Sequence, residues 1–265
     1  MKPAQLAGIG IACAGGIDSG RGLVVTPSPA LPGWESLPLA DMVRERLGTV
    51  TFLVNDASAA ALGEQRFGAG KGVKNLVLVT VGTGIGGGII TDGELYLGAC
   101  GAAGEIGHMT VDADGPLCGC GNTGCLEMLA SGSAVEREAV RRIRNGEHTS
   151  LAESMKGGIE EITARDVEAA AREGDAVALD IVDTAAGWLG IGIVNLVNIF
   201  NPEMVVIGGG MANWGDLLLA PVRRVVQERA FPISARAVSV VLTALDDAGL
   251  YGAAAFALRG GAGAH

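Results

Sequence analysis

Short apolar runs alternate along the chain with longer stretches in which apolar residues recur at helical spacing. The short runs predict buried strands at 6–13, 50–54, 76–81, 89–90, 203–207 and 238–242. The helical spacing predicts helices at 37–47, 57–65, from 133 onward, 163–172, 176–200, 217–229 and 250–258. Because strands and helices alternate, with glycine-rich turns at strand ends, the pattern predicts an α/β protein.

Turn and cap residues mark where several of these elements begin or end. Gly48 is expected to end the first helix, and Asp92-Gly93 predicts a tight turn. Ser133 and Glu136 have the spacing of a capping box, which predicts that a helix begins there. Residues 14–18 are expected to form a loop after the first strand.

Composition narrows the class of protein. The 265 residues are 49% hydrophobic but only 4% aromatic, so aliphatic side chains and alanine must fill the core. The net charge of −10 argues against a nucleic-acid partner. The N-terminus lacks the apolar run of a signal peptide, and the long apolar stretch at 185–200 carries two asparagines, so a buried helix is expected rather than a membrane span. We therefore expect a soluble cytoplasmic protein without a membrane partner, ending in a disordered tail at 260–265.

Three of the five cysteines are clustered. Cys118, Cys120 and Cys125 lie within eight positions, and His108 stands upstream of them. Three thiolates and one imidazole complete a tetrahedral Zn²⁺ set with no position open for water, which predicts a structural metal rather than a catalytic one. An odd number of clustered cysteines also indicates a reducing compartment rather than a disulfide framework.

Two acidic residues, Glu105 and Glu127, flank this cluster. Their position suggests that the metal helps to aim the two carboxylates. Cys13 and Cys100 are isolated and are expected to be buried packing residues.

Asn55 and Asp56 follow directly after a predicted strand, where α/β proteins place ligand groups. Asp56 would be able to accept a proton from a substrate hydroxyl, with Asn55 holding a neighbouring hydroxyl. The alternative is that Asp56 only caps the next helix, and sequence position alone favours the cap.

Two glycine-rich segments follow other strands. The segment 82–88 contains Gly-x-Gly-x-x-Gly, but a strand and an Asp-Gly turn follow it where a dinucleotide fingerprint requires a helix. A hairpin whose N–H groups and Thr83 hydroxyl hold phosphate is one interpretation, and an ordinary glycine turn is the other. The segment 208–210 allows either the approach of a flat ligand or close packing of a helix on the sheet.

Taken together, these residues resemble the ROK family of sugar kinases and repressors, and most closely its bacterial glucokinases. The matching segments occur in the family's order and span nearly the whole chain. They are Leu-Pro-Gly-Trp at 31–34, Asn-Asp-Ala at 55–57, the strand and glycines at 78–88, Gly-Glu-Ile-Gly-His-Met at 104–109, the Cys-x-Cys-Gly-x-x-Gly-Cys-Leu-Glu run at 118–127 and Val-Ile-Gly-Gly-Gly at 206–210.

The resemblance implies the actin-like (ribonuclease H-like) kinase fold, in which two α/β lobes surround a cleft. Residues 1–72 together with the C-terminal helix at 247–265 would form a small lobe. Residues 73–246 would form a large lobe that carries the zinc site.

The resemblance also implies roles for individual residues. Asp56 becomes the expected general base, which takes a proton from the sugar's primary hydroxyl as that oxygen attacks the γ-phosphate of Mg-ATP. The other implied contacts are to sugar hydroxyls from Asn55, Glu105, His108 and Glu127, to ATP phosphates from Thr83 and Gly84, and to the adenosine from the segment around Gly209. His108 would bind Zn²⁺ through one ring nitrogen and a sugar hydroxyl through the other.

The chain departs from the family pattern in three places. Ala14 stands where the family has proline, and Val54 where the glucokinases often have glutamate. The family also opens with a strand and an Asp-x-Gly-Gly-Thr loop that grips ATP phosphates, and no such motif precedes residues 6–13. We therefore expect an incomplete N-terminal lobe with an exposed sheet edge, and poor or no kinase activity from the chain as written.

The expected function is ATP-dependent phosphorylation of a hexose, with glucose favoured. The alternative is a non-catalytic sugar-binding protein, such as the sensor part of a ROK repressor. The sequence leaves open the choice among glucose, mannose, N-acetylglucosamine and allose, and between ATP and polyphosphate as donor. The resemblance also suggests a homo-oligomer.

Overall fold

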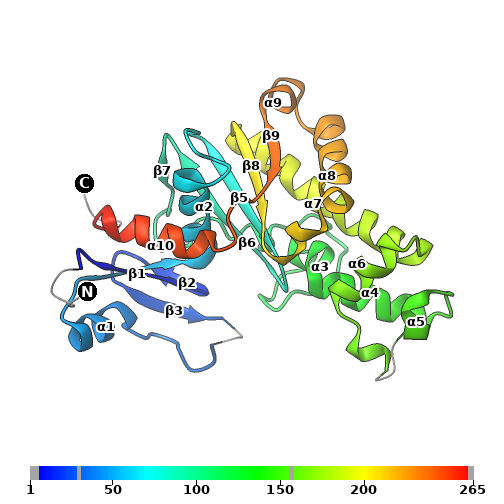
Figure 1. Ribbon diagram of the computed structural model, residues 1–265, viewed down its shortest axis with the longest axis horizontal. Helices are drawn as coiled ribbons and strands as arrows, with labels where there is room; N and C mark the ends of the chain where they lie inside the picture. Colours follow the sequence, from blue (N-terminus) through cyan, green and yellow to red (C-terminus); the bar gives the residue numbers. More distant parts are fainter. Residues whose placement is uncertain (1–5, 29–30, 155–157, 262–265) are drawn as a thin grey trace.

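The computed structural model describes residues 6–28, 31–154 and 158–261. A five-stranded mixed sheet lies at its centre, with helices on both faces, and a smaller α/β part lies beside one end of it (Figure 1). The predicted α/β class is thus confirmed. The expected tail at 260–265 lies largely outside the described residues.

The central sheet has the strand order β7-β6-β5-β8-β9. Its strands are β5 (Leu76–Val81), β6 (Ile85–Thr91), β7 (Glu94–Leu95), β8 (Met204–Gly208) and β9 (Ser239–Leu242). The strands β5, β8 and β9 run parallel, and β6 and β7 add antiparallel neighbours. The middle strands β5 and β8 are buried along most of their length, as expected for strands that helices cover on both faces.

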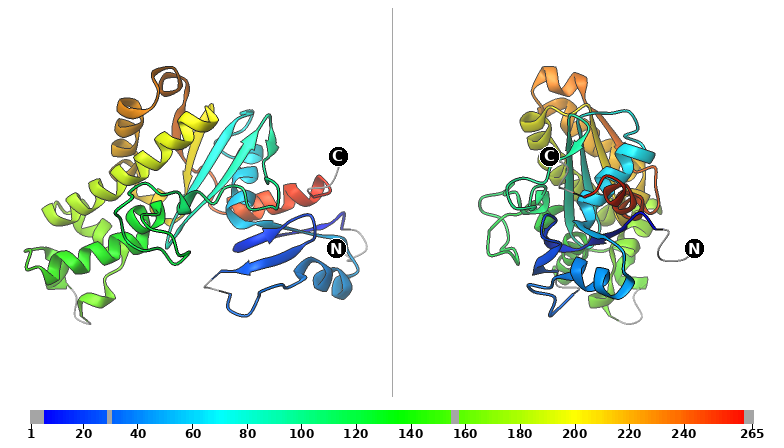
Figure 2. Two further views of the ribbon diagram at one scale, coloured as in Figure 1. Left: turned by 180° about the vertical axis from the view of Figure 1, so that it is seen from behind. Right: turned by 90° about the vertical axis from the view of Figure 1, so that its left-hand side faces the viewer.

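One face of this sheet carries the larger hydrophobic core. The 25-residue helix α7 (Ala176–Phe200) runs along this core and packs against its neighbours (Figure 2, left). Its length and apolar composition would suit a membrane span, but its buried stripe places it in the core, as predicted. The other helices on this side are α3 (Leu126–Ala130), α4 (Gly132–Arg144), α5 (Ser150–Ser154), α6 (Ala164–Arg172), α8 (Asp216–Arg229) and α9 (Pro232–Ala237).

The opposite face carries α2 (Asp56–Phe67) and α10 (Ala248–Leu258). The two helices pack with almost no space between their backbones. A Cβ added to Gly252 would lie 1.6 Å from the carbonyl oxygen of Ala59, and one added to Gly63 would lie 2.0 Å from that of Ala248. Glycine is therefore required at both positions, and the C-terminal helix is fixed against a helix from the first quarter of the chain.

The smaller part contains two short sheets and one helix. Strand β1 (Ile9–Cys13) pairs in parallel with β4 (Thr51–Asn55), and β2 (Gly15–Asp18) pairs antiparallel with β3 (Leu23–Pro27). Helix α1 (Leu39–Leu47) ends at Gly48 in the left-handed conformation, as predicted. Helix α10 also packs against β1 and β4, while the predicted lobe boundary at residue 72 stays a prediction.

Three local predictions are wrong. Residues 15–18 form strand β2 rather than a loop, because Gly15, at a φ of 107°, lets the chain turn directly into a hairpin. The glycines at 86–88 lie within strand β6 rather than in the turn before it. Close neighbours leave them no room for side chains, so glycine is needed there for packing. Helix α4 is capped by Ser131, whose hydroxyl accepts from the N–H of Ala134, and not by Ser133.

Short 3₁₀ helices occupy residues Ile106–His108, Ile159–Glu161 and Gly210–Trp214. The first lies just before the cysteine cluster, and the third follows β8. Both are thus next to segments that the sequence assigns to a binding site.

Candidate active site

A cavity of about 630 Å³ opens at the carboxyl ends of β5, β8 and β9. This is the edge at which open α/β sheets bind ligands. Its lining includes Asp56, the glycines at 208–210, and the segment at 243–250 that leads from β9 into α10. Gly209, predicted to contact the nucleotide, therefore lies in its wall, where its φ of 81° and its contact with Val81 require glycine.

A second, smaller cavity lies between β2, β4 and the loop that precedes the cysteine cluster. Asn55, Asp56 and Glu105, three of the predicted sugar-binding residues, line it. Asp56 and Ala57 line the first cavity as well. The predicted base thus lies where the two cavities meet.

Asn55 and Asp56 have different tasks at the start of α2. The side chain of Asn55 caps the helix, because its Oδ1 accepts from the N–H groups of Ala57 (3.0 Å) and Ser58 (3.1 Å). Its Nδ2 donates to the carbonyl of Gly15 (3.1 Å), which joins the helix to the β2–β3 hairpin. Asp56 is the exposed first residue of the helix, and its Oδ1 also accepts from the N–H of Ala57 (2.9 Å), but the cap is Asn55, so the interpretation of Asp56 as the cap is wrong.

Cys13 lies close to Asp56. It is buried, as predicted, and both its burial and the charge of Asp56 raise the pKa of its thiol. Cys100, by contrast, is exposed, so its prediction as a buried packing residue is wrong.

The turn between β5 and β6 contains Thr83 and Gly84, the predicted phosphate contacts. The N–H groups of Gly132 and Ser133, at the start of α4, donate to the carbonyls of Gly82 (2.7 Å) and Thr83 (3.4 Å) and hold this turn from behind. Thr83 itself is exposed. Among the described residues that line the two cavities, neither Thr83 nor Gly84 occurs, so their phosphate contact stays a prediction.

Glu127 reaches the same turn. Its Oε2 accepts from the N–H of Ile85 at 2.8 Å, and a Cβ on Gly84 would lie 2.3 Å from that oxygen. Glu127 belongs to α3, which begins directly after Cys125. The carboxylate therefore connects the cysteine cluster to the glycine turn, and its predicted contact with a sugar hydroxyl is not tested by the geometry.

His108, Cys118, Cys120 and Cys125 come together as predicted, with all four candidate ligand atoms within 4.8 Å of one another. The Nδ1 of His108 lies 3.7 Å from the Sγ of Cys118, and the Sγ atoms of Cys120 and Cys125 lie 3.7 Å apart. A tetrahedral ion with Zn–S bonds of about 2.3 Å requires sulfurs about 3.8 Å apart, so the donor set fits this geometry.

The glycines between the cysteines make this convergence possible. Gly121 and Gly124 have φ of 90° and 68°, and a Cβ on Gly124 would lie 1.5 Å from the carbonyl oxygen of Asp112. Burial, with the neighbouring thiols of Cys118 and Cys120, raises the pKa of Cys125 to about 12. A bound cation would reverse this effect, because it stabilises the thiolates.

Three residues in the wall of the larger cavity had no role in the sequence interpretation. Asn213 follows the glycines after β8, and Asp246 and Asp247 follow β9. A signal was present for the two aspartates, since they form an acidic pair in the loop that follows a predicted strand, where α/β proteins place ligand groups.

Comparisons with known proteins agree with this geometry. Residues 1–259 match the ROK family. The chain is 42% identical over 247 residues to the glucokinase of Thermotoga maritima, an alignment that covers 93% of this chain and 77% of that protein. It is also 38% identical to the xylose repressor of Caldicellulosiruptor bescii, with 87% of this chain and 57% of the repressor aligned.

Among solved structures, a ROK glucokinase from Streptomyces griseus in complex with glucose and AMPPNP superposes with a TM-score of 0.85 at 38% identity, covering 94% of this chain and 81% of that chain. The expected actin-like sugar kinase fold is thus confirmed. The matched residues, the fold and the identity to relatives all lead to one assignment: the chain belongs to the ROK family.

Proposed function

We propose that the protein transfers the γ-phosphoryl group of Mg-ATP to the primary hydroxyl of a hexose, with glucose the favoured substrate and glucose 6-phosphate the product. The observation that carries this proposal is the position of Asp56 in the walls of both cavities. Phosphoryl transfer needs one group that touches the acceptor hydroxyl at the point where the donor phosphate arrives.

In the proposed reaction, the sugar binds against the residues that line the smaller cavity, whose volume of about 40 Å³ is less than that of a hexose, and the nucleotide binds in the larger one. Asp56 accepts the proton of the primary hydroxyl as the hydroxyl oxygen bonds to the γ-phosphorus. The bond from that phosphorus to the bridging oxygen breaks, and ADP leaves. Positioning and charge neutralisation do most of the work, and Mg²⁺ bound to the phosphates contributes to the latter.

Asn55 and Glu105 line the smaller cavity and are the residues proposed to orient the sugar there. Asn55 keeps one N–H for a ligand, since its oxygen and its other N–H serve the α2 cap and Gly15. His108 and Glu127 are proposed to complete the set, and Thr83 and Gly84 to contact phosphate from the β5–β6 turn.

The cysteine cluster is proposed to hold a structural Zn²⁺. Because Nδ1 of His108 faces the cluster, its Nε2 remains for a sugar hydroxyl. A metal held by three thiolates and one imidazole has no position left for substrate, so its proposed role is to fix the backbone between Glu105 and Glu127.

A second candidate function is sugar binding without turnover. It is favoured by the match to a xylose repressor, of which the chain covers 57%. The retained acid at position 56, where the two cavities meet, favours the kinase over this alternative.

The test is a coupled assay for ADP formation with glucose, mannose, N-acetylglucosamine and allose, and with ATP or polyphosphate as donor. We expect glucose and ATP to be preferred, and Asp56→Asn to lower kcat by about 10²–10⁴-fold while glucose still binds. Sugar binding by calorimetry without turnover under any donor, with Asp56→Asn unchanged in affinity, would favour the binding function instead.

A further inference from the structure

Glu64 is a completely buried carboxylate that the mechanism above does not use. Its Oε1 accepts from the Thr243 hydroxyl and from the N–H groups of Ala244 (3.1 Å) and Leu245 (3.1 Å). Its Oε2 accepts from the N–H of Ala69 at 2.7 Å. Four donors thus reach this carboxylate, three of them at Oε1 and one at Oε2.

Three of the four donors belong to the segment 243–245, which leaves the sheet at the end of β9. Thr243 still pairs with the sheet, since its N–H donates to Ile207. The segment then crosses to α10 and forms part of the wall of the larger cavity, to which Thr243 and Leu245 contribute. The N–H groups of Ala244 and Leu245 lie outside any helix or strand, so Glu64 supplies the partner that regular structure does not.

Glu64 connects this segment to the helix that carries the predicted base. Glu64 lies in α2, which begins at Asp56. The glycine contacts of Gly63 and Gly252 fix α10 against the same helix. The cavity wall at 243–250 is therefore attached to α2 on both sides, by Glu64 at its start and by α10 at its end.

We propose that Glu64 is a positioning residue for the nucleotide: it holds the segment 243–247 at a set distance from Asp56, so that the larger cavity keeps the width that the nucleotide requires. The inference rests on the proposed function of that cavity. A buried carboxylate costs desolvation that an apolar residue would avoid. Its donor set, in contrast, suits the irregular backbone of a cavity wall.

Glu64→Gln is the sharpest test, because the side chain keeps its size. The amide has one oxygen, so it places an NH₂ group either against the N–H of Ala69 or against the donors of 243–245. We expect the KM for ATP to rise about tenfold, the effect of one lost charge-assisted hydrogen bond, with the KM for glucose changed less than about twofold. Thr243→Val, which removes one donor only, should raise the KM for ATP in the same direction by less.

Glu203, an exposed carboxylate that also accepts from two backbone N–H groups, provides a control outside the cavity wall. Glu203 stands just before β8, and its Oε2 accepts from the N–H groups of Lys74 (3.0 Å) and Asn75 (2.9 Å), which stand just before β5. These residues lie at the opposite end of the sheet from the cavity. Glu203→Gln should leave the KM for ATP unchanged. Equal increases in the KM values for ATP and glucose in Glu64→Gln, or an unchanged KM for ATP in a cooperatively folded variant, would overturn the inference.

A direct titration with a fluorescent ADP analogue separates this inference from the proposed function. If the chain phosphorylates no hexose, the proposed function fails, but the titration still compares the nucleotide affinity of the wild type with that of Glu64→Gln. Weaker binding in the variant supports the positioning role, and equal binding contradicts it.

Discussion

At the scale of single residues, Asn55 rather than Asp56 is the cap of α2, although the carboxylate of Asp56 shares the N–H of Ala57 with it. Its oxygen caps α2 and its amide holds the β2–β3 hairpin through Gly15. Asp56 is then exposed at the meeting point of the two cavities. Asparagine and aspartate cap helices about equally well, so with Asn55 as the cap, Asp56 is left for the chemical role proposed above.

Asn55→Ala should therefore affect stability as well as sugar binding. It removes the cap of α2 and the bond to Gly15, and we expect the free energy of unfolding to fall by about 1–2 kcal/mol. Urea denaturation followed by circular dichroism measures the change. Asn55→Ser, which restores a capping oxygen but not the amide, should recover most of the stability; failure to recover it would contradict the capping role.

The same pair of residues shows how far the sequence alone could lead. Both asparagine and aspartate cap helices well, so the pattern located the site but not the division of roles, which depends on the backbone angles of Asn55. The cysteine cluster was predictable because ligand chemistry and spacing restrict it strongly. Glu64 was not, because nothing in the sequence relates it to Thr243, and only the tertiary fold brings the two together.

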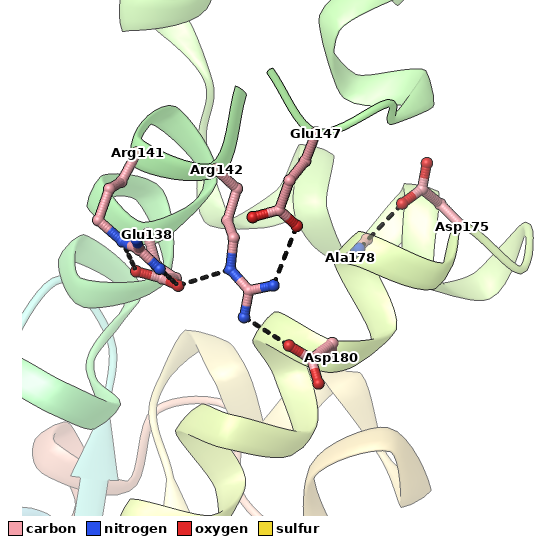
Figure 3. A network of polar contacts seen from close by, with 7 residues as sticks. All are labelled: Glu138, Arg141, Arg142, Glu147, Asp175, Ala178 and Asp180. Atoms are coloured by element: carbon pink, nitrogen blue, oxygen red, sulfur yellow. Dashed lines mark hydrogen bonds and ion pairs between the residues drawn. The ribbon is translucent and has the colours of Figure 1, made fainter. Parts of the chain in front are cut away.

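At the scale of secondary-structure elements, ion pairs fix the corner where α4 approaches α7 (Figure 3). The guanidinium of Arg142 contacts Glu138 (2.8 Å), Glu147 (3.1 Å) and Asp180 on α7. Its side chain is 20% exposed, so these contacts are screened less than those of surface pairs. The hydrogen bond with Arg141, despite partial burial, lowers the pKa of Glu138.

Asp175 caps α7 at this corner, and its ionisation should make the stability of the fold depend on pH. Burial opposes its charge, but bonds from the N–H groups of Ala178 and Ser150 and from the hydroxyls of Thr149 and Ser150 outweigh this and lower its pKa. A lowered pKa in the folded state stabilises the fold above the unfolded pKa of about 3.9, and this contribution is lost as pH falls through the folded value.

Asp175→Asn should then destabilise the protein at pH 7, and the difference from the wild type should shrink as the pH falls below about 4. Urea unfolding at several pH values measures it. Asp183→Asn is a suitable control, since Asp183 pairs only at the surface with Arg224. A difference for Asp175→Asn that stays constant across this pH range would contradict the assignment.

The contact between α2 and α10 leads to a separate prediction. Gly252→Ala would place a methyl group 1.6 Å from the carbonyl oxygen of Ala59, which forces the helices apart. We expect a loss of about 1–3 kcal/mol in the free energy of unfolding. Gly187→Ala is the control, because Gly187 lies in α7 with nothing within 4 Å of the added carbon. Alanine should be neutral or stabilising there, so equal losses in both variants would count against the packing argument.

At the scale of the whole molecule, the two cavities depend on different parts of the fold. The wall of the larger one comes from β5, β8, the segment after β9, the start of α10 and α2, whose first residues also line the smaller one. The smaller one takes its lining from the β2 strand, the start of α2 and the loop that ends at Glu105. That loop continues into His108 and the cysteine cluster. The cluster is therefore attached to the proposed sugar-binding cavity more directly than to the proposed nucleotide-binding cavity.

This arrangement predicts the order in which metal removal affects the protein. Metal analysis should find about one Zn²⁺ per chain, and chelation should release the segment between Glu105 and Glu127. Because Glu105 lines the smaller cavity, glucose affinity should fall first, by about tenfold or more. The affinity for a fluorescent ADP analogue should fall less, since Glu64 and α10 hold the wall of the larger cavity independently of the cluster.

Cys120→Ser should reproduce the effect of chelation, whereas Cys100→Ser, at an exposed cysteine outside the cluster, should not. Zinc-free protein that binds glucose as tightly as the zinc-loaded form would contradict the proposed role of the metal in aiming the sugar-binding residues.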